Sequence, residues 1–214
     1  MCYTPEISIQ AFIINVISSF LLFFLTSSKT LKIIALYFFY LGWMQLFDYL
    51  LWVYPKPDPI NAATTKLAMI ISYLQPVVYL MIASIITNKM HMLSSIVVLI
   101  YTMYAIPYAV DIYDSVQFTS PKGTPPRQTL VWDWLQWDGP ISTAYVMASL
   151  IITYQYLQGS IRNWMLVFII VSFLFARFKY SVNQSIGRFW CYFGSFVPLL
   201  TLLLTTLTAK NLRF

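Results

Sequence analysis

Few side chains of this chain have the types and spacing that chemistry needs, and three of them stand close together. Asp48 is the one acid inside a long apolar segment, with Gln45 three residues before it and Trp52 four residues after it. That spacing places all three on one face of an α-helix. An acid at the centre of a membrane helix costs about 3 kcal/mol. The face is therefore either a polar patch for a small molecule, ion or proton, or a contact that fixes helix packing.

Two other apolar segments carry polar residues that could join this patch. Gln75 precedes Pro76 in mid-segment, where proline frees a backbone carbonyl that an amide could satisfy. Arg188 and Trp190 open the last apolar segment, at the depth expected for Asp48. Arg188 could pair with Asp48, or extend to the membrane surface instead.

We predict that Asp48 is buried against other helices and hydrogen-bonded, with Arg188, Lys66 or Gln75 as its partner. The candidate ligand-binding residues share apolar surroundings and a polar group: Gln45, Asp48, Trp52, Gln75, Arg188 and Trp190.

Patterns that would indicate catalysis or a cofactor are absent from the sequence. Cys2 and Cys191 stand far apart, and His91 is the single histidine, so a Cys/His metal site is excluded. With six glycines the chain has no phosphate-binding loop, and no nucleophile stands near a base. The last apolar segment has no lysine for a retinal Schiff base. We therefore expect no catalytic residue, metal or cofactor, which argues against an enzyme.

The composition places the chain in a lipid bilayer. Of its 214 residues 59% are hydrophobic and 9% charged, against roughly 25% charged in soluble domains. A soluble protein with so few charges could not cover its surface. The net charge of +6 reflects 7 acids against 13 bases without a basic run, so nucleic acid is not an expected partner. Lipid is the expected partner, and self-association into a homo-oligomer is compatible with the sequence.

The elements that must position these residues are membrane helices. A span needs about 20 mostly apolar residues, which predicts an all-α, polytopic transmembrane bundle of about seven helices in one membrane domain, 1–214. The predicted spans are 7–25, 31–53, 62–84, 92–109, 140–157, 161–176 and 186–208. The long connection, 111–139, ends with Trp132, Trp134 and Trp137 beside two acids. Tryptophans in such a setting are typical of interfacial anchors on a short helix at the membrane surface.

The distribution of charge predicts an orientation. With the N-terminus outside, the inner side carries no acid and six bases: Lys29, Lys32, Lys89, Arg162, Lys210 and Arg213. The outer side carries seven bases, so a count of Lys and Arg alone is nearly even. The flanks of the first span usually dominate, and there Glu6 precedes the span while Lys29 and Lys32 follow it. We therefore predict an N-terminus outside or in the lumen and a cytoplasmic C-terminus.

A series of short motifs carries a family resemblance. Residues 44–52 read Met-Gln-Leu-Phe-Asp-Tyr-Leu-Leu-Trp, followed by Gln75-Pro76 and by Trp190-Cys191. This series resembles uncharacterised multi-pass membrane proteins of large DNA viruses of protists and of their hosts. The resemblance implies a host or virion membrane and no particular reaction. Two functions stay open: small-ligand binding or transport at the Asp48 patch, or a structural or assembly role in a viral or organellar membrane without a ligand.

Overall fold

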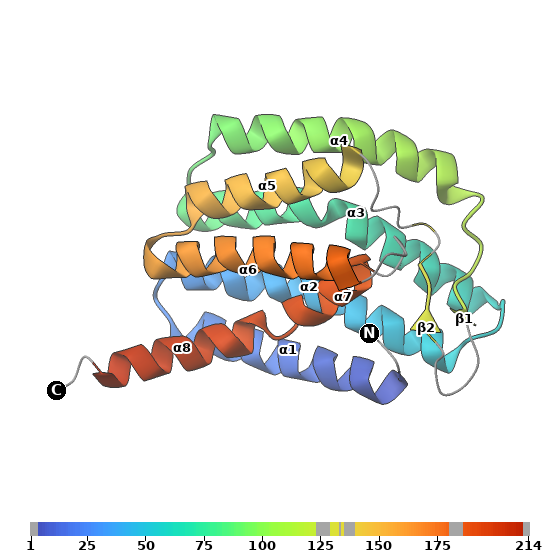
Figure 1. Ribbon diagram of the computed structural model, residues 1–214, viewed down its shortest axis with the longest axis horizontal. Helices are drawn as coiled ribbons and strands as arrows, with labels where there is room; N and C mark the ends of the chain where they lie inside the picture. The colour runs from blue at the N-terminus through green and yellow to red at the C-terminus, as the bar shows by residue number, and fades with distance from the viewer. Residues whose placement is uncertain (1–3, 123–128, 133, 135–139, 180–185, 212–214) are drawn as a thin grey trace.

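The computed structural model describes residues 4–122, 129–132, 134, 140–179 and 186–211 (Figure 1). Its helices are α1 (Pro5–Leu25), α2 (Lys29–Val53), α3 (Pro59–Thr87), α4 (Met92–Tyr113), α5 (Pro140–Tyr156), α6 (Gly159–Lys179), α7 (Ile186–Gly194) and α8 (Val197–Asn211). A short antiparallel pair, β1 (Pro121–Lys122) and β2 (Thr129–Leu130), lies in the long connection. The prediction of an all-α helical bundle is confirmed.

Local sequence signals explain where α1 and α3 begin. The Thr4 hydroxyl accepts a hydrogen bond from the Ile7 N–H at 3.3 Å, and the Asp58 carboxylate accepts one from the Asn61 N–H at 2.7 Å. In both cases a proline is the first helical residue, a position where its missing N–H does no harm. Helix α3 ends at Asn88, whose positive φ of 57° turns the chain out of the helix.

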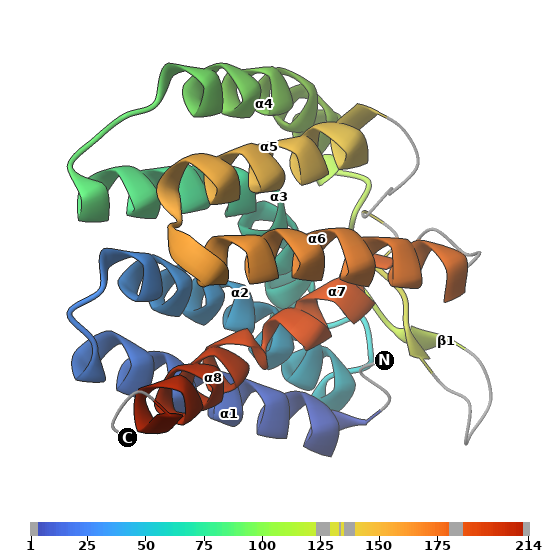
Figure 2. The same ribbon diagram turned by 60° about the vertical axis from the view of Figure 1, so that its left-hand side comes forward.

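The region predicted as one last span, 186–208, is two helices. Helix α7 ends at Gly194, and α8 starts at Val197 after a turn at Ser195 and Phe196. Pro198 explains the break, because proline cannot donate to the carbonyl four residues earlier and its ring clashes with it. In the first turn of a new helix neither penalty applies. Helix α8 then packs along α1 (Figure 2).

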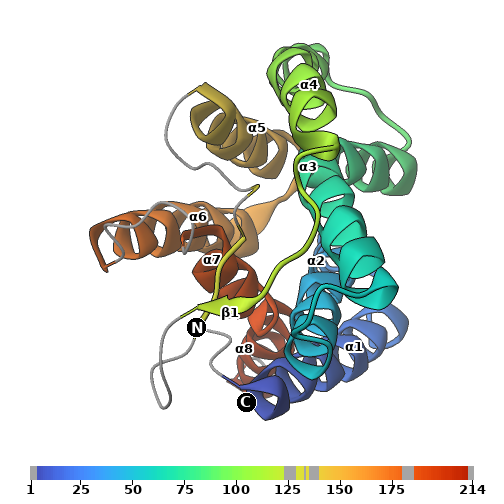
Figure 3. The same cartoon turned by 90° about the vertical axis from the view of Figure 1, so that its right-hand side faces the viewer.

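Successive helices from α1 to α6 run back and forth, so their loops gather at two ends of the bundle (Figure 1). We call one the acid-free end; it holds the connections 26–28, 88–91 and 157–158. The other, the loop end, holds the start of α1, the connection 54–58 and the strands β1 and β2. The two strands lie across the end of the bundle (Figure 3).

The distribution of side chains is that of a membrane protein. Among the described residues four helices, α1 to α4, are long and apolar enough to cross a bilayer. Large apolar side chains such as Phe24, Ile85 and Met103 are exposed, while Asn15, Asp48 and other polar side chains are buried. In a bilayer the apolar exterior needs no cover, and polar groups are best paired inside. The helices are thus compatible with an integral membrane protein.

Candidate functional site

Asp48 lies inside the bundle, as predicted, but its described partner is a residue of the long connection. The Asp48 side chain is 0% exposed, and its Oδ1 accepts a hydrogen bond from Trp132 Nε1 at 3.0 Å. The prediction that Asp48 is buried and hydrogen-bonded is confirmed. Of the three predicted partners, Lys66 lies over the Tyr113 ring, with 4.2 Å from Nζ to the ring centroid. Gln75 bonds elsewhere, and the Arg188 side chain lies outside the described residues.

Trp132 and Trp134 form a plug in the loop end. They are 0% and 1% exposed, and their rings stack with centroids 5.0 Å apart. Tyr73 of α3 donates its hydroxyl hydrogen to the Trp134 carbonyl at 2.8 Å. The prediction of interfacial anchors on a surface helix is therefore wrong for these two residues, because the chain turns back into the bundle and buries them. Trp137 lies outside the described residues.

Asn61 holds the same end together and was not singled out by the sequence. Its Nδ2 donates to the carbonyls of Tyr54 at 2.6 Å and Thr119 at 2.8 Å. Its Oδ1 accepts from the Thr119 N–H at 3.0 Å and from the Thr65 hydroxyl at 3.2 Å. All four hydrogen-bonding positions of the carboxamide are used. Asn61 thus joins the connection before α3 to the connection that follows α4.

Gln75 and Trp190 meet around Tyr145, in the middle of the bundle. Gln75 Oε1 accepts a hydrogen bond from the Tyr145 hydroxyl. The Trp190 ring stands edge-on to the Tyr145 ring, 5.2 Å between centroids, and its Nε1 donates to Ser172 Oγ at 2.8 Å. Gln75 is 2% exposed, and its Nε2 has no acceptor among the described residues. A buried amide donor without an acceptor is costly.

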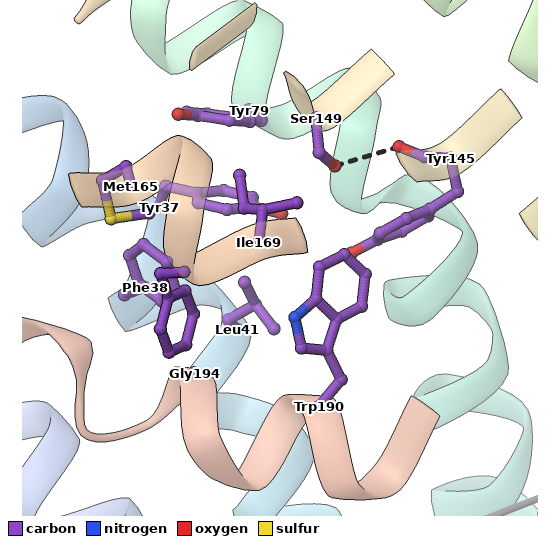
Figure 4. A pocket seen from close by; sticks show the side chains of 11 residues that line it. Tyr37, Phe38, Leu41, Tyr79, Tyr145, Ser149, Met165, Ile169, Trp190 and Gly194 are labelled. Atoms are coloured by element: carbon purple, nitrogen blue, oxygen red, sulfur yellow. Dashed lines mark hydrogen bonds between the residues drawn. The ribbon is translucent and has the colours of Figure 1, made fainter. Parts of the chain in front are cut away.

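A small cavity lies beside this group, between α2, α3, α5, α6 and α7 (Figure 4). Tyr37 and Tyr79 stack at one side of it, with ring centroids 4.0 Å apart, and Tyr145 and Trp190 line the other side. The centre of a water molecule can occupy a space of about 20 Å³ in it, so the cavity has room for one or two waters. The walls are largely aromatic and aliphatic, so polar groups facing the space are few.

The chain has no match in the comparisons. Protein-family models, curated proteins and solved structures all give none. Function must therefore be inferred from the geometry of the side chains.

The structure divides the six predicted ligand-binding residues into two groups. Gln45 and Asp48 are buried on α2, with Trp52 half-buried further along the same helix. In the described part of the chain, none of these three lines the cavity beside Tyr145. Gln75 and Trp190 form the second group.

The tyrosines of the cavity were missed because tyrosine counts as apolar in a search for spans. Their hydroxyl groups, not their hydropathy, are the signal in the sequence. A buried tyrosine normally needs a partner for its hydroxyl, so tyrosines in mid-span mark places where polar groups must meet. Tyr79, for example, bonds the Thr153 hydroxyl at 2.9 Å.

Proposed function

We propose that this chain is a multi-pass membrane protein that binds a small hydrogen-bond acceptor in the bundle core. The observation that carries the proposal is the buried Nε2 of Gln75, which has no acceptor among the described residues. Inside a bilayer no bulk water is available to satisfy it. Gln75 does not itself line the cavity, but its partner Tyr145 does. The cavity offers space, and the Trp190 ring and the stacked rings of Tyr37 and Tyr79 offer apolar contact. Few polar groups among apolar walls are usual in small-molecule sites.

Native mass spectrometry of the purified full chain tests the proposal. Wild type should release a bound small molecule when the ions are activated, and Gln75→Leu should lack it. Gln10→Leu is the matched control, because it makes the same chemical change at an exposed position of α1. Absence of any bound mass in wild type, together with a Gln75→Leu variant more stable than wild type, would contradict the proposal.

A structural role without a ligand is the second candidate, and the plug favours it. Asp48 is bonded to Trp132 inside the protein, which is how a packing contact rather than an open binding patch is built. The resemblance to membrane proteins of large DNA viruses and their hosts fits a viral or organellar membrane. Retention of wild-type assembly and membrane location by Gln75→Leu, with loss of both in Asp48→Leu, would favour this candidate.

We also propose that the N-terminus faces outside or the lumen. The support is the acid-free end, which carries Lys29, Lys89 and Arg162 and would face the cytoplasm. A glycosylation sequon added to the connection 114–139 should be modified in microsomes. Modification of a sequon added after Phe214 would contradict the proposal and indicate the opposite orientation.

A further inference from the structure

The acid-free end contains a polar pocket that none of the functional residues above lines. It has a volume of about 480 Å³ and is formed by the connections between α1 and α2, α3 and α4, and α5 and α6. Lys29, Lys89 and His91 supply its basic groups. Both lysines are exposed and His91 is half-buried, so the pocket is open to the surroundings of the protein.

Among the described residues, the charges of this pocket have no carboxylate counterpart. Every acid in the described part of the chain, from Glu6 to Asp114, lies at or toward the loop end, either within a helix or directly beside a helix end. Two other bases of the acid-free end rest on aromatic rings: Lys32 Nζ is 5.4 Å from the Phe23 centroid, and Arg162 Cζ is 5.2 Å from the Tyr154 centroid. Lys29 and Lys89 line the pocket instead. Two ammonium groups around one space favour an anion.

Hydrogen bonds fix the walls and leave donors for that anion. Gln155 accepts from the Ser94 N–H at 3.1 Å and from the Ser94 hydroxyl. Because a backbone N–H can only donate, the atom of Gln155 that faces it must be the oxygen, and the NH2 group is left for a ligand. Thr30 Oγ1 accepts from the Gln158 N–H at 3.2 Å, which ties the first connection to the third. The Gln155 amide is therefore held in place before an anion arrives.

We propose that this pocket binds a phosphate group. Two ammonium groups, an imidazole and an amide NH2 match the charge and the several acceptor oxygens of a phosphate monoester. A phosphate at this depth can come from a lipid headgroup or from a soluble phosphate compound. The two sources share the same recognition chemistry, and experiment separates them.

The first arm uses soluble phosphate. The full chain is placed in nanodiscs of phosphatidylcholine, and its thermal unfolding is followed as sodium phosphate replaces sodium chloride at constant ionic strength, so that screening stays equal. Binding to the folded state should raise the unfolding temperature in a saturable manner. The second arm replaces part of the lipid by phosphatidic acid, and oleate at equal charge serves as the control without phosphate.

The Lys29→Gln/Lys89→Gln double variant should need about a hundredfold more phosphate, about tenfold for each charge-assisted contact. Lys32→Gln/Arg162→Gln removes the same charge from the same end, outside the pocket, and should bind as wild type. Stabilisation by soluble phosphate alone, by phosphatidic acid alone, or by both supports the site and identifies its source. No stabilisation of wild type by either, an equal effect of oleate, or equal weakening of both double variants would overturn it. If the Lys29→Gln/Lys89→Gln variant does not fold, the wild-type titrations alone still test the phosphate site.

Discussion

Asn61 and Gln75 lie on the same helix, and both carboxamides are buried, yet their surroundings differ. Asn61 uses every hydrogen-bonding position of its amide, to Thr65 of α3, to the connection before α3 and to the connection after α4. Gln75 makes one bond, to Tyr145, and keeps a donor without an acceptor among the described residues. A fully satisfied amide holds a structure together. A partly satisfied amide can still bind another group, so hydrogen-bond satisfaction distinguishes these two amides.

The largest expected effect comes from removing the satisfied amide. Asn61→Leu leaves the carbonyls of Tyr54 and Thr119 and the N–H of Thr119 without their partner. We expect a loss of about 4 kcal/mol in the free energy of unfolding, measured by denaturant titration in detergent. The exposed Gln10→Leu change should have almost no effect. A loss for Asn61→Leu as small as that for Gln75→Leu would end the distinction between the two amides.

Asp48 tests whether the plug, like Asn61, holds the loop end together. Asp48→Leu removes the acceptor of the buried Trp132 N–H, and we expect a loss of about 3 kcal/mol. Asp48→Asn keeps an acceptor and should lose about 1 kcal/mol. Thermal unfolding in detergent measures the order of stability of wild type, Asp48→Asn and Asp48→Leu. Equal stability of wild type and both variants would mean that the contact contributes nothing to the fold.

Gly42 tests a third buried amide, that of Asn15, which donates to the Ser195 carbonyl at 3.1 Å. A Cβ on Gly42 would stand 2.3 Å from Asn15 Oδ1, so Gly42→Ala must displace Asn15. We expect a loss of about 2 kcal/mol in the same unfolding assay. Gly194→Ala is the matched control, because its Cβ would meet Phe38 at an ordinary 3.5 Å. Equal behaviour of the two alanine variants would show that Asn15 moves freely.

The smallest effect is expected in the core. Tyr145→Phe removes the hydrogen bond that Gln75 makes among the described residues and should lower the unfolding free energy by about 1 kcal/mol. Tyr79→Phe, which loses its bond to Thr153, provides the comparison at the other wall of the cavity. A loss for Tyr145→Phe several times that for Tyr79→Phe would indicate that Gln75 is a structural anchor like Asn61.

Local signals in the sequence were enough for the helices and for the burial of Asp48. Apolar length predicts helices, and the energetic cost of a lipid-facing acid predicts that Asp48 turns inward. The Trp132 partner could not be predicted, because it depends on how a long connection folds back between helices. Tryptophan at a membrane surface is the commoner case, and the two situations look alike in sequence. The break before α8, by contrast, had a signal in Pro198 that the continuous apolar run concealed.

The stacked pair of Trp132 and Trp134 also gives the protein a built-in optical reporter. Indole emission moves to shorter wavelength away from water, and two rings with centroids 5.0 Å apart exchange excitation energy. The pair comes from the long connection, while the pocket that seats it belongs to the helices. Undocking of that connection would therefore shift the emission of these two tryptophans, two of the seven in the chain, and uncouple their rings. Opening of the loop end can thus be followed by tryptophan fluorescence, without any added label.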